Sequence, residues 1–78
     1  MNDRYQHLLR KSLDAKRGGH AAWTVQSTGE RVAVALVLSR ADWLAEIDYS
    51  IAEAMERTGP EWVAILPQVA RQLADEAV

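Results

Sequence analysis

The chain has no cysteine among its 78 residues. Disulfides and thiolate metal sites are therefore excluded, and a composition without cysteine suits the reducing cytoplasm. Long apolar runs are also missing, since the longest covers only residues 32–38 and is far too short to span a bilayer. The N-terminal segment lacks the continuous apolar core of a signal peptide. These absences predict a small soluble protein of the cytoplasm, without contact to a membrane.

Bulky apolar side chains are few, because 13 of the apolar residues are alanine. A chain of this length forms one domain with a small core, and its stability is expected to be marginal or assisted. Residues 1–78 are therefore predicted to form a single domain. Tryptophans at positions 23, 43 and 62 fall in the apolar sets of three different expected elements, which favours a shared core cluster over ligand stacking.

Charge is distributed unevenly along the chain. The net charge of −2 argues weakly against general affinity for nucleic acid, because the phosphate backbone attracts cations. Residues 1–20, however, hold five Lys and Arg residues against two Asp, a net charge of +3. The remainder holds four Arg against nine acidic residues, a net charge of −5. The simpler interpretation of this uneven charge is a solvated basic helix beside solvated acidic ones. The more specific interpretation is a polarised docking surface.

The first part of the chain predicts a helix followed by a β-hairpin. Apolar side chains recur at helical spacing over about 3–17, and Gly18-Gly19 follows. Alternating apolar residues then predict a two-stranded antiparallel hairpin over about 20–38, with a turn centred on Thr28-Gly29. In this register Trp23 faces the second strand, and both faces of the hairpin are partly apolar.

The second part of the chain predicts two helices, one over about 40–57 and one over about 60–76. Pro67 is expected to kink or break the last helix, because proline removes a backbone hydrogen bond and clashes with the preceding turn. The predicted fold is thus α+β, of order α-β-β-α-α. Either helices cover the hairpin, or two copies join their edges into a four-stranded sheet across a homodimer.

Motifs that carry catalytic chemistry are not evident. The pair Gly18-Gly19 does not form a phosphate-binding loop, and neither His7 nor His20 has a carboxylate at the spacing of a zinc or iron site. Four carboxylates line one face of the expected helix over about 40–57 and can be interpreted as a solvated face or as a cation site; they are Asp42, Glu46, Glu53 and Glu56. The solvated face is favoured. We predict no catalytic, cofactor or metal site, no small-molecule ligand, and no enzymatic activity.

Candidate residues for binding a partner lie on two surfaces. Basic side chains share the outer face of the first helix, and Tyr49 is an aromatic residue among charges. The basic residues are Arg4, Arg10, Lys11 and Arg17. The stretch GERVAVALVLSRADWL has the Ala, Val and Arg usage typical of bacteria with GC-rich genomes.

The sequence therefore predicts a small bacterial protein-interaction or regulatory domain without catalytic activity, which binds another protein or itself as a homodimer. The alternative is a nucleic-acid-binding protein that uses the basic first helix. A more distant alternative is the accessory subunit of an enzyme.

Overall fold

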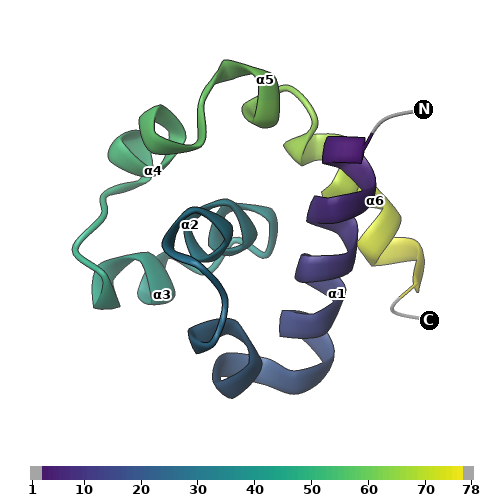
Figure 1. Ribbon diagram of the computed structural model, residues 1–78, viewed down its shortest axis with the longest axis horizontal. Helices are drawn as coiled ribbons and strands as arrows, with labels where there is room; N and C mark the ends of the chain where they lie inside the picture. Colours follow the sequence, from purple (N-terminus) through teal and green to yellow (C-terminus); the bar gives the residue numbers. More distant parts are fainter. Residues whose placement is uncertain (1–2, 77–78) are drawn as a thin grey trace.

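The computed structural model describes residues 3–76, and within this range all regular secondary structure is helical, without any β-strand. The helices are α1 (Asp3–Thr24), α2 (Thr28–Val37), α3 (Ala41–Glu46), α4 (Ile51–Thr58), α5 (Pro60–Val63) and α6 (Leu66–Glu76). Figure 1 shows α2 end-on in the middle of the molecule, with the other helices around it. Direct packing joins α2 to α1, α3, α4 and α6. The fold is thus one ring of helices around a central helix.

The predicted α+β fold is wrong, because the segment assigned to the hairpin over 20–38 is helical. Its supposed turn is the start of α2, where the Ser27 hydroxyl accepts a hydrogen bond from the Glu30 amide at 3.3 Å. The Glu30 carboxylate in turn accepts one from the Ser27 amide at 3.1 Å. This reciprocal capping box satisfies two backbone donors at a helix start and fixes the helical direction of the chain. Neither the hairpin nor a four-stranded sheet exists in residues 3–76.

Helix α2 is buried on nearly all sides, which explains the misleading alternation. The buried residues of this helix are Val32, Ala33, Val34, Ala35 and Val37. A helix that is covered on every side is apolar around its whole circumference, so its sequence carries no helical period. A run of this kind cannot be distinguished from a buried strand by periodicity alone. Here alanine, a strong helix former, and the capping box decide in favour of the helix.

Helix α1 is longer than the predicted helix over about 3–17 and contains a kink. Gly19 has φ 72° and ψ −158°, a backbone conformation that residues with a Cβ atom rarely adopt. After this kink the chain continues for one short helical segment that brings Trp23 into the core. The Trp23 ring stacks on Trp43 of α3 with centroids 4.9 Å apart, and the Trp23 indole donates a hydrogen bond to the Arg31 carbonyl at 2.9 Å.

The remaining helices are shorter than predicted. Instead of one helix over about 40–57, the chain forms α3 and α4, with Asp48 between them in the left-handed region at φ 62°. Ser50 and Glu53 make a second capping box at the start of α4. Instead of one kinked helix over about 60–76, α5 ends before a turn at 64–65, and Pro67 lies in the first turn of α6. Proline is tolerated there because the first turn has no internal partner for its missing N–H.

Candidate functional site

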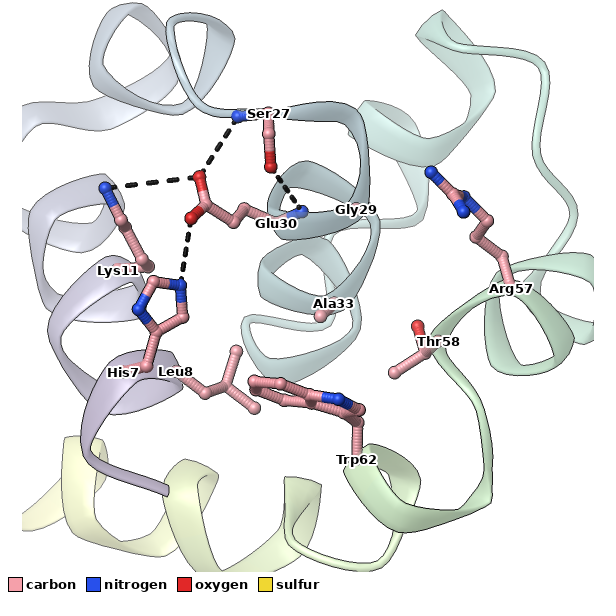
Figure 2. Close-up of a pocket in the computed structure, with 10 residues that line it drawn as sticks. All are labelled: His7, Leu8, Lys11, Ser27, Gly29, Glu30, Ala33, Arg57, Thr58 and Trp62. Carbon is pink, nitrogen blue, oxygen red and sulfur yellow. Dashed lines mark hydrogen bonds and ion pairs between the residues drawn. The ribbon is translucent and has the colours of Figure 1, made fainter. Parts of the chain in front are cut away.

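A surface pocket of about 300 Å³ opens between α1, the start of α2 and the segment that joins α4 to α5 (Figure 2). Its lining residues come from four helices and the residue before α2, so the packing around α2 creates the pocket. They are His7, Leu8, Lys11, Ser27, Gly29, Glu30, Ala33, Arg57, Thr58 and Trp62. Polar groups lie on two opposite walls, and apolar side chains form the floor between them.

The first wall is organised around the carboxylate of Glu30. His7 Nε2 lies 2.9 Å from one of its oxygens, and Lys11 Nζ lies 4.0 Å from the other, which also accepts the Ser27 amide (Figure 2). Burial alone raises the pKa of Glu30, but the Ser27 amide, the His7 hydrogen bond and the charge of Lys11 together hold it below its ordinary value. Glu30 therefore remains ionised at neutral pH, and this wall is close to charge balance.

The second wall consists of the end of α4 and the backbone of α2. Arg57 projects from the last turn of α4, and its guanidinium makes no hydrogen bond or ion pair with any residue of the range 3–75. Gly29 faces it without a side chain, and a Cβ atom at Gly29 would lie 4.0 Å from Arg57 Nη2. The Thr58 hydroxyl donates to the Ala54 carbonyl at 2.7 Å, so its oxygen stays available as an acceptor only. Arg57 is thus a charge on this wall without a partner.

The floor of the pocket is apolar. Trp62 of α5 is half-buried and lies beside Leu8, while its ring meets the His7 ring edge-on at a centroid distance of 6.3 Å (Figure 2). Trp62 is therefore separate from the stacked pair Trp23 and Trp43, and the predicted cluster of three tryptophans forms only in part. An aromatic floor between cationic side chains suits a group with an apolar stem and a negative end.

The structure separates the basic residues that the sequence grouped as a partner-binding face. Arg4 forms an ion pair with Glu61 at 2.8 Å, and Lys11 turns toward Glu30 in the pocket. Arg10 and Arg17 are exposed on the outer side of α1. One of the four predicted cations thus belongs to the pocket, and one is paired with α5.

Tyr49 lies between α3 and α4, where it is half-buried and packs against the hydrophobic core. The sequence placed it on an exposed acidic arc because it assumed one continuous helix there. The break at 47–50 rotates Tyr49 away from that arc. Packing against the core therefore explains why an aromatic residue stands among charged ones in the sequence, and no partner surface is needed to explain it.

Sequence reasoning did not assign Arg57 or the network around Glu30 to a site, and it placed Trp62 in a core cluster. A signal for Glu30 was present, since Ser27 and Glu30 have the spacing of a capping box directly before an apolar run. No such local signal exists for Arg57, which reaches the pocket only because α4 packs against α2.

No family model, curated protein or solved structure matches this chain. Within residues 3–75, His, Asp and Glu do not form a group of three or more that could hold a metal ion. In the same part of the chain, every helix is too short or too polar to cross a membrane. The geometry of the pocket is therefore the main guide to function.

Proposed function

We propose that this chain is a small non-enzymatic interaction domain, and that its pocket receives an acidic side chain of a partner protein. The observation that carries the proposal is the guanidinium of Arg57, which has no partner in residues 3–75 and faces a pocket that also contains Lys11. Glu30 is the one carboxylate of the lining, and it is already occupied by His7, Lys11 and the Ser27 amide. A negative group from outside would complete the charge balance. A cytoplasmic location stays part of this proposal.

The dimensions and chemistry of the pocket agree with a side chain as the ligand. A volume of about 300 Å³ is at the lower end of ligand sites and accommodates one or two side chains. Arginine binds a carboxylate through two parallel hydrogen bonds, which adds directional specificity to the charge attraction. The floor of Leu8 and Trp62 can hold the methylene stem of glutamate. Exposed ion pairs alone contribute little, so partial enclosure by this floor matters for affinity.

Calorimetric titration with matched peptides tests this proposal. One peptide carries a glutamate flanked by apolar residues, and the second carries glutamine at the same position. We expect the glutamate peptide to bind more tightly, and Arg57→Gln to weaken its binding by about tenfold, a typical effect for a partly enclosed charged pair. Arg71→Gln, at an exposed position of α6, is the control and should leave affinity unchanged. Equal binding of both peptides, or an equal effect of both substitutions, would contradict the proposal.

The alternative of nucleic-acid binding through the first helix has less support in this geometry. Arg4 and Lys11 are engaged with Glu61 and Glu30, and Asp14 accompanies the two remaining cations on the outer side. Fewer free cations release fewer counterions, which lowers both the affinity and its salt dependence. A fluorescent duplex titrated at low salt should therefore bind only weakly. Sub-micromolar binding that is lost on reversing the charge of the exposed arginines of α1 would instead favour the alternative.

A further inference from the structure

Helix α4 exposes two bulky apolar side chains on one flank. Ile51 is 57% exposed and Met55 is 43% exposed, and they lie one helical turn apart. Within residues 3–75, the third large apolar side chain with high exposure is Val25, which lies in the turn after α1. Isolated apolar residues at a surface are ordinary, whereas neighbouring ones beside a groove indicate a contact surface.

Ile51 borders an apolar groove of about 260 Å³ between α2, α3 and α4. The apolar lining residues are Ala35, Leu36, Ala41, Leu44 and Ile51, and Arg40 lies among them. Ala54 lies on the side of α4 that is buried against the core. At 100° per residue, Ile51 and Met55 lie on one flank of Ala54 and Arg57 lies on the other. The groove and the Glu30 pocket are therefore two separate surfaces.

The segment that forms the α3 and α4 sides of this groove is rich in carboxylates, whereas the one charged residue of the lining itself is Arg40. Residues 41–56 contain five carboxylates and no Lys or Arg, and all five are exposed. They are Asp42, Glu46, Asp48, Glu53 and Glu56. Arg40 neutralises Asp42 at 2.8 Å, and His20 lies 2.8 Å from Glu46. Asp48 and Glu56 have no ion-pair partner in residues 3–75, so residues 41–56 keep an uncompensated negative charge.

A second copy of this chain does not fit the groove well. A symmetric dimer through α4 would bring the two acidic segments together, and like charges across an interface weaken it. The basic outer side of α1 from another copy has the complementary charge, but α1 exposes none of the large apolar side chains. An occupant of the groove needs both apolar side chains and positive charge.

We infer that the groove between α2, α3 and α4 binds an amphipathic helix of a partner protein, whose apolar side chains are flanked by Lys or Arg. Apolar residues one turn apart on this helix pack beside Ile51 and Met55, and its cations lie near Asp48 and Glu56. Helices with an apolar ridge commonly dock in grooves of this kind. The inference concerns a different surface from the Glu30 pocket and does not depend on what the pocket binds.

Anisotropy titration of labelled helical peptides tests this inference. The probe is an amphipathic peptide of about 14 residues with leucine on one face and lysine on the other, and its counterpart has glutamate in place of lysine. We expect the lysine peptide to bind at about 0.15 M salt with an affinity at least about tenfold higher than that of the glutamate peptide. Higher salt should weaken this binding, because the acidic side chains are exposed.

Substitutions at exposed positions locate the binding surface without disturbing the fold. Ile51→Asn together with Met55→Gln should weaken binding of the lysine peptide about tenfold or more. Val25→Asn is the matched control, since it removes an exposed apolar side chain elsewhere and should leave binding unchanged. Circular dichroism verifies that each variant is folded.

Three outcomes would overturn the inference. The first is equal binding of the lysine and glutamate peptides, or no binding of either. The second is an equal loss of binding in Val25→Asn, which would show nonspecific adhesion to apolar residues. The third is a dimer in sedimentation equilibrium that dissociates on Ile51→Asn with Met55→Gln, which would make a second copy the occupant.

Discussion

Trp23 is the side chain at which the end of α1, the start of α2 and α3 meet. It is only 1% exposed, stacks on Trp43 and donates its indole hydrogen to the Arg31 carbonyl. Arg40 lies over the outer ring of this pair, with its guanidinium carbon 4.4 Å from the Trp43 centroid. Since one side chain joins three helices, its removal should weaken the packing of each of them.

Trp23→Ala is therefore expected to lower the free energy of unfolding by about 3–5 kcal/mol, the range for removal of a buried large aromatic side chain. Urea denaturation followed by circular dichroism measures this change. The predicted hairpin register placed Trp23 against the second strand, whereas in the structure Trp23 stacks on Trp43. A cooperative transition close to that of the wild type would contradict the burial of this residue.

Ser12 shows the opposite situation, a buried polar group without a partner. The side chain is fully buried in α1, and its hydroxyl makes no hydrogen bond. An unsatisfied buried hydroxyl destabilises the native state, and alanine is the better helix former. Ser12→Ala should raise the free energy of unfolding by about 1 kcal/mol in urea denaturation. Ser27→Ala is the matched control and should lower it by about 1 kcal/mol, since it removes the cap of α2.

At the scale of elements, the sequence predicted helices better than it predicted their ends. The expected helices over 3–17, 40–57 and 60–76 fall in segments that are mainly helical, because their apolar residues recur with a helical period. The break at 47–50 was not predicted, whereas the break at 64–65 lies beside the kink or break that was expected at Pro67. The hairpin was wrong because residues 32–37 of α2 are buried on nearly all sides and so show no clear helical period.

The candidate site could be predicted only in part. Lys11 was selected as a cation of the first helix, and the capping box that positions Glu30 is visible in the sequence. That these two residues meet depends on the angle at which α1 packs on α2, which no local pattern records. Arg57 and Trp62 come from α4 and α5, and their approach to the same pocket is a property of the assembled ring.

Glu30 links the stability of α2 to pH. Its folded-state pKa lies below the ordinary value of 4.5, so the unfolded chain binds a proton more readily than the folded chain. The stabilisation by ionised Glu30 is thus present above about pH 4.5 and is lost as the pH falls through the lower folded-state pKa. Glu30→Gln should be less stable than the wild type at pH 7, and the difference should narrow toward pH 3. Urea denaturation at several pH values measures this difference in the free energy of unfolding. A difference that does not change with pH would contradict the stabilising role of ionised Glu30.

At the scale of the whole molecule, charge is separated between opposite sides. The basic helix α1 lies on the right of Figure 1, and the acidic segment of α3 and α4 lies on the left. Arg10 and Arg17 remain exposed on the first side, and Asp48 and Glu56 on the second. Such a dipolar surface orients charged partners during encounter. The hairpin on which the predicted homodimer was based is absent from residues 3–76, while the homodimer itself stays a prediction.

The central position of α2 has a consequence for how the molecule opens. Helices from both the N-terminal and the C-terminal part of the chain cover α2, so neither part can leave without exposing it to water. Local fluctuations can release α5 or the end of α6, but the amide protons of residues 32–37 should exchange with solvent only when the whole chain unfolds. Hydrogen exchange of these amides would then report the global stability of the protein, and Trp23→Ala and Ser12→Ala should shift their free energy of exchange by the same amount as the free energy of unfolding.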